Sequence, residues 1–425
     1  NEAGLWDDSF IESHKCLTEA VHAKGGVLFA QLHHQGMMCS RAVTGYPVKG
    51  PSDLPSPKHL EPVAAFTTEE CYKLIEDFGD AALRAKKAGF DGVEVHGAHF
   101  YLIAQFLSKY ANKRVDEFGG DYEGRFRFAK LVMENIRKKC GEDYPMLFRI
   151  SADEFLDGGN TLEDCVIYSA MAEAAGAAAI HVSTGSGIGG NIVTPQFFEP
   201  GFNEDSAAAV KRAVGIPVIA VGRINDPAVA EHILRTGKAD MVTLGRQSVC
   251  DPEFPKKLAQ GRRDEIFHCA GCMQRCYYGK GCEEDDTGIS CILNPFTGKE
   301  SRWIMAPAEK PKRILIVGAG VAGLEAAWIL AKRGHRVTVW EKNSLPGGNF
   351  RLAAVPPHKT DFAKAIGTYV TLGKKYGVTF QFGKEATEET VLAEQADAVI
   401  LATGAKPLVP RIPGLDPEKL TFAGD

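Results

Sequence analysis

Between residues 27 and 244, short apolar runs alternate along the chain with longer amphipathic stretches. Apolar runs of four to six residues are typical of parallel strands buried on both faces, and they cover 27–32, 92–96, 146–150, 179–183, 218–221 and 241–244. Apolar residues recur at helical spacing between them, over 68–88, 122–139, 162–175 and 227–235. This alternation predicts an α/β fold with a parallel sheet, either closed into a barrel or wound open.

Two glycine–arginine pairs favour the barrel. Gly222-Arg223 and Gly245-Arg246 each follow one of the last two predicted strands. In a (β/α)8 TIM barrel, the loops after the last two strands commonly bind phosphate through backbone N–H groups, and a guanidinium adds a matching charge. Residues 1–265 are therefore predicted to form a TIM barrel with a phosphate site. Counting back makes 27–32 the third strand, so we expect this chain to lack the first two.

Four cysteines follow the predicted barrel. Cys269, Cys272 and Cys276 lie within eight residues, and Cys291 follows after a loop. Three grouped thiolates with a fourth from a returning segment can surround an iron–sulfur cluster. Zinc is the alternative, because tetrahedral zinc sites also use closely spaced thiolates, although structural zinc more often takes two matched pairs. We therefore expect residues 266–310 to hold an iron–sulfur cluster and a linker.

A glycine motif opens the last part of the chain. Gly318, Gly320 and Gly323 follow an apolar run and precede a stretch rich in alanine and leucine, and a second apolar run then ends in Glu341. Strand, glycine turn and helix in this order form the dinucleotide-binding fingerprint, in which the acidic residue binds a ribose hydroxyl. Residues 311–425 are therefore predicted to form a Rossmann-like FAD- or NAD(P)-binding domain, which we expect to be truncated.

Composition changes this picture little. The chain has 425 residues and a formal net charge of −5, which does not suggest binding to nucleic acid or to an anionic membrane. It shows no apolar run long enough for a membrane span and no secretory signal, so we expect a cytoplasmic protein. Six cysteines outside the group are expected to be reduced and buried as small hydrophobic residues: Cys16, Cys39, Cys71, Cys140, Cys165 and Cys250.

Several motifs resemble the iron–sulfur flavoenzyme branch of the old yellow enzyme family. That branch contains 2-enoate reductases, 2,4-dienoyl-CoA reductase, bile-acid enone reductases and trimethylamine dehydrogenase. Together with the cysteines, the Gly-Arg pairs and the glycine motif, the resemblance covers nearly the whole chain. Its further motifs are Gln31-Leu-His-His-Gln-Gly36, His96-Gly-Ala-His99-Phe-Tyr101-Leu-Ile-Ala-Gln-Phe-Leu, Asn112-Lys-Arg-Val-Asp116-Glu-Phe-Gly-Gly120 and Phe148-Arg149-Ile-Ser151.

The resemblance implies FMN in the barrel, a 4Fe–4S cluster on the cysteines and FAD in the second domain. Gln31 and Arg149 would contact the FMN ring, where the permanently charged guanidinium would stabilise an anionic reduced form. The FMN phosphate would be held by Gly222, Arg223, Gly245 and Arg246. The family spacing indicates Cys291 as the fourth cluster ligand and leaves Cys282 as a surplus thiol. Electrons would pass from NAD(P)H to FAD, to the cluster, to FMN and to the substrate.

His96, His99 and Tyr101 lie at the C-terminal end of the predicted strand 92–96, where barrels carry their active sites. We expect the histidines to donate hydrogen bonds to a substrate carbonyl or carboxylate, and Tyr101 to protonate the α-carbon as general acid. A metal site is the alternative for the two histidines, but no third ligand motif lies near this mouth. Phe100 stands where the family usually has glycine, a departure that would displace Tyr101 or narrow the pocket.

The function that this resemblance implies is NAD(P)H-dependent reduction of the C=C bond of an α,β-unsaturated carbonyl or carboxylate, as in 2-enoate reductases. Dienoyl-CoA reductases resemble one another in a histidine that residues 184–202 lack, and His181 is expected to be buried structure. The alternatives are a bile-acid 3-oxo-Δ4 or 2,4-dienoyl-CoA reductase, and an oxidase similar to trimethylamine dehydrogenase that passes electrons to a partner flavoprotein. A small unsaturated molecule is the expected partner, and a homo-oligomer is left open.

Overall fold

The computed structural model describes residues 3–55, 61–190, 192–279 and 288–406, and near the end of the chain 408–409, 412–414, 416, 418 and 421. The chain separates into two compact units. The first unit comprises residues 1–194 and 200–244, and the second comprises 195–199 and 245–425. The prediction for Cys282 lies outside the described residues.

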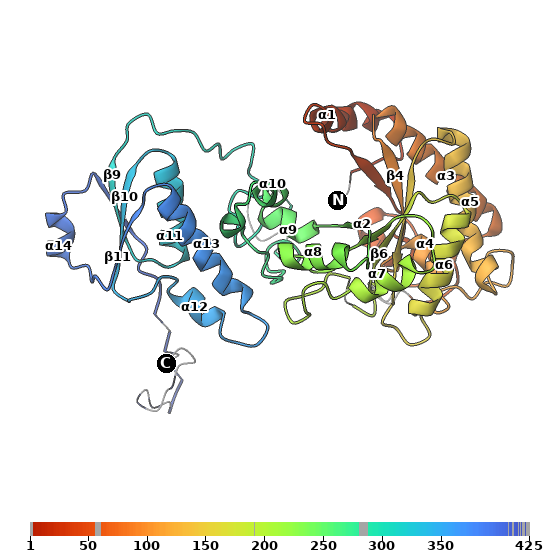
Figure 1. Cartoon of the computed structure of the whole chain (residues 1–425). Coiled ribbons are helices and arrows are strands. Elements are labelled where there is room, and N and C mark those ends of the chain that lie inside the picture. Colours follow the sequence, from red (N-terminus) through yellow and green to blue (C-terminus); the bar gives the residue numbers. More distant parts are fainter. Residues whose placement is uncertain are drawn as a thin grey trace. The chain divides into compact units, whose positions relative to one another are not determined.

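The first unit is built on a six-stranded parallel sheet (Figure 1). Its strands pair in their order along the chain: β1 (Phe29–Leu32), β4 (Gly92–Gly97), β5 (Met146–Ser151), β6 (Ala179–Ser183), β7 (Val218–Ala220) and β8 (Met241–Val242). A doubly wound sheet reverses its strand order at one point, so this uninterrupted order indicates a barrel-type arrangement. All six predicted strands are present, but β1 begins two residues later and β8 ends two residues earlier than predicted, because the apolar runs extend beyond the paired residues.

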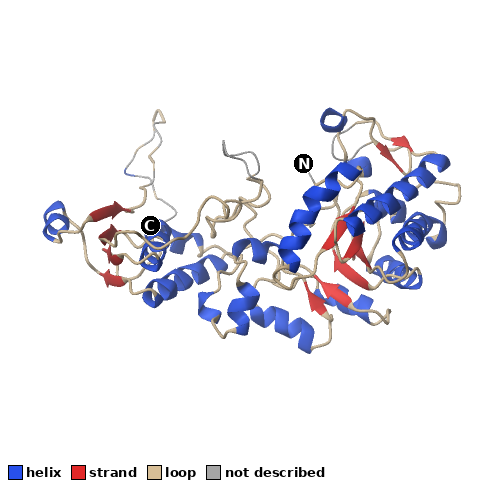
Figure 2. Ribbon diagram, turned by 90° about the horizontal axis from the view of Figure 1, so that it is seen from above, coloured by secondary structure: helices blue, strands red, loops and turns tan. Residues whose placement is uncertain are grey.

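Helices flank this sheet, as Figure 2 shows in a second view. They are α1 (Ile11–His22), α2 (Arg41–Thr44), α3 (Thr68–Lys87), α4 (Leu102–Leu107), α5 (Tyr122–Cys140), α6 (Leu162–Ala174), α7 (Glu204–Lys211) and α8 (Pro227–Arg235), and β2 (Lys49–Gly50) pairs separately with β3 (Ala64–Ala65). Local sequence explains where the main helices begin. Thr67 and Glu70 form a reciprocal capping box at α3, and Asp226 caps α8 ahead of Pro227.

The two faces of the six-stranded sheet differ in polarity, because alternate residues of a strand face opposite sides. The face toward the helices is apolar, and its members share one hydrophobic core: Val93, Val95, Phe148, Ile150, Ile180 and Val182. The opposite face, called the interior face below, is polar. Strand register places side by side on it Gln31, Glu94, His96, Arg149, Ser151, His181 and Ser183. The sheet therefore presents a band of hydrogen-bonding groups that reaches the C-terminal ends of its strands, where barrels carry their active sites.

The second unit contains a four-stranded parallel sheet in the order β11-β10-β9-β12. Its strands are β9 (Arg313–Val317), β10 (Arg336–Glu341), β11 (Thr379–Phe382) and β12 (Ala398–Leu401). Its helices are α9 (Gly245–Cys250), α10 (Phe254–Ala259), α11 (Val321–Lys332), α12 (Asn349–Ala353), α13 (Asp361–Lys375) and α14 (Glu388–Ala393). Figure 1 shows α11 and α13 together beside the sheet. A glycine turn between β9 and α11 is the predicted Rossmann-like arrangement.

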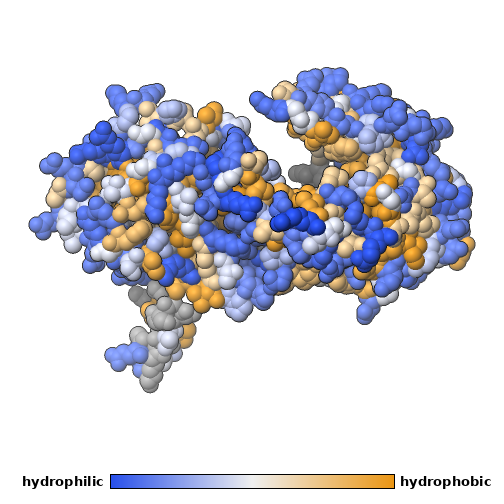
Figure 3. Space-filling view, in the orientation of Figure 1, coloured by the Kyte–Doolittle hydropathy of each residue, from blue (hydrophilic) through white to orange (hydrophobic). Residues whose placement is uncertain are grey.

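Hydrophilic residues cover most of the outer helices on the face of the first unit drawn in Figure 3. Apolar residues occur between them in smaller groups. Within the described part of the chain, no helix combines the length and the apolar character that crossing a bilayer requires.

The cysteines outside the predicted cluster group divide into two sets. Cys71, Cys140, Cys165 and Cys250 are buried, as predicted. The prediction is wrong for Cys16, which is exposed, and for Cys39, which is half-buried. Helix α1 buries only Thr18, so most of its surface, including Cys16, faces away from the core.

Candidate active site and cofactor sites

A buried carboxylate lies at the centre of the interior face. Glu94 accepts a hydrogen bond from Gln31 Nε2 at 2.5 Å and pairs with His181 Nδ1 at 2.7 Å. Arg149 Nη1 lies 3.9 Å from the same carboxylate. Burial alone would raise the pKa of Glu94, but His181, Arg149 and Gln31 together hold it below its usual value. Glu94 thereby fixes Gln31 and Arg149, the two residues predicted to contact a flavin ring.

Two polar atoms of the interior face suit a bound ligand. Arg149 Nε and His181 Nε2 are buried without a hydrogen-bond partner among the residues that the structure describes. His181 Nδ1 must donate to the Glu94 carboxylate, so in the neutral ring Nε2 is an acceptor. Buried polar atoms without partners are unfavourable. The pyrimidine edge of a flavin offers both carbonyl oxygens and an N–H group, so these residues fit the implied FMN.

The three predicted catalytic residues come together at the end of β4. The Tyr101 ring centroid lies 5.1 Å from that of His96 and 6.5 Å from that of His99, and the two imidazoles are 5.0 Å apart. His33, from the segment after β1, adds a third imidazole at 4.7 Å from the Tyr101 ring. Tyr101 is the N-cap residue of α4. The next residue, Leu102, donates its N–H to the His34 carbonyl at 2.9 Å, which ties α4 to the segment that carries His33.

The turn before Tyr101 has an unusual backbone. His99 and Phe100 both have positive φ, 61° and 66°, in the left-handed region that favours glycine. Phe100 therefore takes the conformation of the expected glycine, at a cost of about 1–3 kcal/mol. Its ring is fully buried with Met37 and Met38, which offsets the strain. Tyr101 nevertheless packs against all three histidines.

Both predicted donor imidazoles are neutral at physiological pH. Burial lowers the pKa of His96 well below its usual value, and neighbouring His99 and Arg149 add to the effect. Burial, followed by the charge of Arg149, lowers the pKa of His99 to about 3. His96 Nδ1 accepts the Ala98 N–H at 3.2 Å, which leaves Nε2 as a donor. His99 Nε2 shares a 2.7 Å hydrogen bond with Ser183 Oγ, so His96 is the better placed donor for a substrate oxygen.

Glu94→Gln is expected to destabilise the protein by about 3 kcal/mol at neutral pH, because Arg149 would lose its buried counter-charge. Since the folded state lowers the pKa of Glu94, its contribution is present above the usual glutamate pKa of about 4.3 and is lost as the pH falls through the folded value. Urea denaturation of wild type and variant should therefore show a stability difference that is large at neutral pH and shrinks in acid.

Glu12→Gln is the matched control for this measurement. Glu12 forms an exposed ion pair with Lys15, in which the glutamate side chain is 80% exposed. Exposed pairs contribute little, so the control should change the free energy of unfolding by less than about 0.5 kcal/mol. A difference in Glu94→Gln that is equally small, or that does not depend on pH, would contradict the proposed role of the carboxylate.

The residues predicted to bind the FMN phosphate fall into both units. Gly222 and Arg223 follow β7 with φ of 140° and 45°, and a Cβ on Gly222 would lie 3.1 Å from that of Asn203. Glycine therefore allows the close approach of these two segments. Gly245 and Arg246 belong to the second unit, where Arg246 also lines a cavity formed by cysteines. The phosphate site stays a prediction.

The four predicted cluster ligands line one cavity of the second unit. Two chain segments contribute to it, one with Cys269, Cys272 and Cys276 and the other with Cys291. The remaining lining residues are Arg246, Val249, Cys250, Ala270, Met273, Arg275, Ile292 and Leu293. The cavity thus combines thiols with two guanidinium groups and apolar side chains.

These surroundings fit an anionic metal–sulfur group. Burial raises the pKa of the thiols of Cys269, Cys272 and Cys276, so their ionisation needs a nearby cation, which a metal supplies. Arg246 places a permanent positive charge near Cys269 and Cys276. Among the described residues, no three Cys, His, Asp or Glu side chains are grouped as a single metal ion would require. The iron–sulfur cluster therefore stays a prediction that the lining supports.

The predicted glycine motif forms the turn between β9 and α11. Gly318 has a φ of 106°, and a Cβ there would lie 2.3 Å from the Ala402 carbonyl oxygen. A Cβ on Gly323 would lie 2.0 Å from the Gly318 carbonyl oxygen, so the helix packs closely on the turn. A Cβ on Gly320 would meet no described atom within 4 Å. The open side at Gly320, at the N-terminal end of α11, suits a pyrophosphate.

Glu341 lies at the end of β10, as the fingerprint requires. Its Oε2 accepts the Ala319 N–H at 2.9 Å, and its Oε1 accepts the Asn343 N–H at 2.9 Å. The carboxylate is thereby tied to the glycine turn. Because each carboxylate oxygen has two lone pairs, Glu341 keeps acceptor capacity for a ribose hydroxyl.

Two alanine substitutions separate the roles of these glycines. Gly318→Ala is expected to lower the stability of the protein by about 1–3 kcal/mol, because the new Cβ is strained at positive φ and collides with backbone. Gly320→Ala should leave stability unchanged and weaken FAD binding, because its methyl group would occupy the open side of the turn. Thermal denaturation and the FAD content of purified protein give the two readouts. Equal FAD content in Gly320→Ala and wild type would contradict the assignment.

Sequence reasoning missed three residues of the barrel site: His33, Glu94 and Ser183. His33 stands in a motif that was noticed, but the motif does not say which of its histidines meets Tyr101. Glu94 left a usable signal, since it interrupts the apolar run Gly-Val-Glu-Val-His. A carboxylate in a strand buried on both faces requires partners, and these are the residues that the interior face provides.

Comparison with known proteins extends these observations. Residues 1–265 match the NADH:flavin oxidoreductase / NADH oxidase family, and residues 258–389 and 312–424 match the pyridine nucleotide-disulphide oxidoreductase family. A cinnamate reductase of Clostridium sporogenes is 35% identical over 427 residues, which cover 96% of this chain and 64% of that protein.

Solved structures give the same result. A 2-naphthoyl-CoA reductase complex matches with a TM-score of 0.92 at 33% identity, covering 96% of this chain and 64% of that one. Histamine dehydrogenase from Rhizobium sp. 4-9 matches with a TM-score of 0.86 at 29% identity, covering 94% of this chain and 59% of that one.

The chain thus spans less than two thirds of the length of these relatives. The matches confirm the resemblance to the old yellow enzyme family and the two folds expected from the sequence, a TIM barrel and a Rossmann-like domain. The chain belongs to the NADH:flavin oxidoreductase / NADH oxidase family.

Proposed function

We propose that the protein reduces the C=C bond of an α,β-unsaturated carbonyl compound or carboxylate, with NAD(P)H as electron donor. One observation carries this proposal: a neutral His96, whose Nε2 is a hydrogen-bond donor, lies beside Tyr101 and next to Arg149 on the interior face. A carbonyl or carboxylate oxygen needs such donors. The similarity to a cinnamate reductase supports this substrate class.

Each residue of the group has a distinct task in the proposed reaction. His96 binds the substrate oxygen and withdraws electron density from the conjugated double bond, which makes the β-carbon electrophilic. Arg149 holds a fixed positive charge in a site with little water, where electrostatic stabilisation is effective. The Tyr101 hydroxyl gives a proton to the α-carbon. Ser183 holds His99 at its ring nitrogen, which keeps the imidazole next to His96.

Three redox groups would complete the site. When bound, FMN, FAD and a 4Fe–4S cluster would supply the hydride and electron-transfer chemistry that connects NAD(P)H with the substrate. We propose that Gln31 and Arg149 contact the FMN ring, and that the glycine turn and Glu341 bind FAD. The proposed cluster ligands are Cys269, Cys272, Cys276 and Cys291.

Amine oxidation is the main alternative, because histamine dehydrogenase is among the similar structures. An ammonium group requires a carboxylate or aromatic faces around it. Glu94, the carboxylate of the interior face, is already bound by Gln31, His181 and Arg149. The Tyr101 ring already packs against His33 and His96. The donors of His96 and Tyr101 suit an oxygen instead, which favours the reductase.

A substrate screen with anaerobically purified protein tests the proposal. Cinnamate, a 3-oxo-Δ4 steroid, a dienoyl-CoA and trimethylamine would each be offered, with NADH or NADPH for the first three and a dye acceptor for the amine. Consumption of NADH or NADPH that depends on an unsaturated compound is the expected result. Oxidation of the amine, without reduction of any unsaturated compound, would overturn the proposal in favour of the alternative.

A further inference from the structure

Cys250 is a fifth cysteine at the cysteine cavity. From the sequence it was expected to be an ordinary buried thiol, and it is only 1% exposed. It lines the same cavity as the four proposed ligands, however, and lies within hydrogen-bonding range of Cys291. Cys250 is therefore adjacent to a proposed ligand sulfur.

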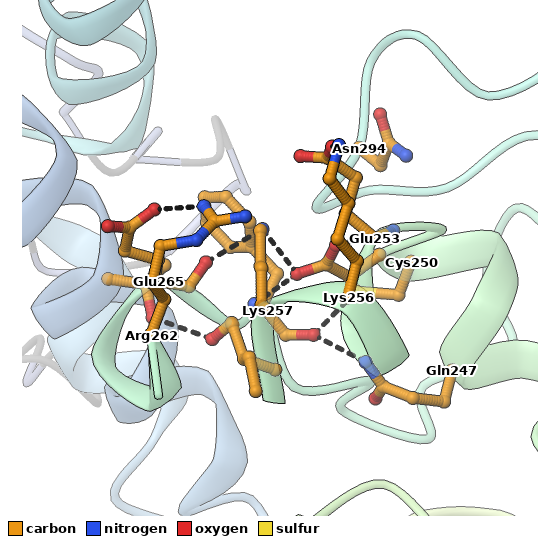
Figure 4. Close-up of polar contacts among 12 residues, drawn as sticks. Gln247, Cys250, Glu253, Lys256, Lys257, Arg262, Glu265 and Asn294 are labelled. Carbon is orange, nitrogen blue, oxygen red and sulfur yellow. Dashed lines mark hydrogen bonds and ion pairs between the residues drawn. The ribbon is translucent and has the colours of Figure 1, made fainter. Parts of the chain in front are cut away.

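Helix α9, which ends at Cys250, is fixed to the segment that carries the first three ligands. Gln247 Oε1 accepts the Cys269 N–H at 2.8 Å, and its Nε2 donates to the Phe267 carbonyl at 2.8 Å; Figure 4 shows this glutamine near Cys250. Asp251, the next residue, accepts the Phe267 N–H at 3.0 Å and pairs with the buried ammonium of Lys257 at 2.7 Å.

The segment that carries Cys291 is fixed to the same helix. Asn294 Nδ2 and Thr297 Oγ1 both donate to the Val249 carbonyl, at 3.3 and 2.8 Å. Val249 directly precedes Cys250 in α9. Hydrogen bonds between side chains and backbone thus hold α9 to both segments that carry the proposed ligands, and they bring Cys250 and Cys291 to the same cavity.

The Cys250 thiol has one proton and two acceptors within reach. The Phe267 carbonyl lies 3.6 Å from its Sγ and can accept this proton, but it is a neutral acceptor that also accepts from the Gln247 amide. Cys291 becomes an anionic thiolate when it binds metal, and charged acceptors form the stronger hydrogen bonds. The proton is therefore directed to Cys291, whose sulfur also accepts the Leu293 N–H at 3.4 Å.

We propose that Cys250 is not a metal ligand but donates a hydrogen bond to the sulfur of Cys291 and thereby raises the reduction potential of the cluster. The inference rests on the iron–sulfur centre of the proposed function. A reduced cluster carries one more negative charge than the oxidised cluster, and a donor at a ligand sulfur stabilises that charge. Hydrogen bonds to the sulfurs are among the factors that set cluster potentials.

The test compares wild type, Cys250→Ala and Cys250→Ser as anaerobically purified proteins. All three should contain the same amounts of iron and sulfide. At a fixed ambient potential, Cys250→Ala should lower the ratio of reduced to oxidised cluster by up to about tenfold, which for a one-electron couple corresponds to about 59 mV. Potentiometric titration followed by electron paramagnetic resonance measures this ratio. Cys250→Ser keeps a donor and should lie between the other two proteins.

Cys71→Ala is the matched control, because Cys71 is equally buried but belongs to α3 of the first unit. Its cluster potential should equal that of wild type. Iron lost from Cys250→Ala would identify Cys250 as a ligand and overturn the inference, as would an unchanged potential in a variant that keeps its iron. A wild-type protein without iron would instead overturn the proposed cluster, and this inference with it, so the two failures are distinguishable.

Discussion

Tyr101→Phe is expected to slow the reduction of an unsaturated substrate on the order of 10²–10⁴-fold, because it removes the hydroxyl that is proposed to protonate the α-carbon. The phenyl ring remains, so the contacts with His33 and His96 should persist and the flavin content should not change. Stopped-flow measurement of the two half-reactions locates the effect. Reduction of the protein by NAD(P)H should keep its rate, and only oxidation by the substrate should slow.

Two further variants complete this comparison. His96→Ala should weaken the binding of substrate or of a carbonyl analogue, because His96 is proposed to hold the substrate oxygen in the ground state and in the developing enolate. His99→Ala should weaken it less, because His99 is bound by Ser183 and is proposed to keep His96 in place. A normal oxidative rate in Tyr101→Phe would remove the tyrosine from the chemistry. The proton would then come from a histidine or from water. Phe100, which stands where the family usually has glycine, would then be the residue that displaces Tyr101 from the flavin.

Cys291→Ser is expected to abolish iron binding and, with it, the reaction driven by NAD(P)H. The same result is expected for serine at the other proposed ligands, Cys269, Cys272 and Cys276. Substrate reduction driven by dithionite should survive in these variants, because the residues of the barrel site are unchanged. Iron analysis and the two activity assays on the same preparations check the prediction.

Cys282→Ser is the control from the same part of the chain, since Cys282 is predicted to be a surplus thiol. It should keep its iron. If Cys291→Ser kept its iron and Cys282→Ser lost it, Cys282 would be the fourth ligand and Cys291 the surplus thiol. Turnover with NAD(P)H at the normal rate in a protein without iron would contradict the proposed route of electrons through the cysteine centre.

The strands and the main helices could be predicted from the sequence, because buried parallel strands leave short apolar runs between longer amphipathic stretches. The run 179–183 coincides with β6, and the stretch 227–235 coincides with α8, whose start is marked by Asp226 and Pro227. Strand β8 was predicted too long, since its apolar run continues into the loop before α9. An apolar pattern does not show where backbone pairing ends.

The candidate active site could be predicted only where one motif carries several of its residues. His96, His99 and Tyr101 lie within six residues, so any turn after the strand brings them together. Glu94 and Ser183 belong to different strands, and only the register between strands makes them neighbours of the predicted residues. The sequence shows which residues of a strand share a face. It does not show which residue of the neighbouring strand lies beside each of them.

The approach of Cys250 to Cys291 is a stronger example of the same limit. Cys250 lies outside the cysteine motif, and nothing in its local sequence separates it from Cys165, another buried thiol. Its place depends on the packing of α9 between two segments that follow it in the chain. The spacing of cysteines along the chain does not predict tertiary contacts of this kind.

The hydrogen bonds of α9 also bear on how the proposed cluster would be assembled. Gln247 binds the backbone of Cys269 and Thr297 binds the backbone of Val249, so both thiol-bearing segments are gathered by contacts that involve no sulfur. Ordering a backbone residue costs about 1–2 kcal/mol of conformational entropy, and these contacts would meet part of that cost without metal. We therefore expect removal of iron from the proposed cluster to leave both segments folded, so that iron and sulfide could be restored to the folded protein.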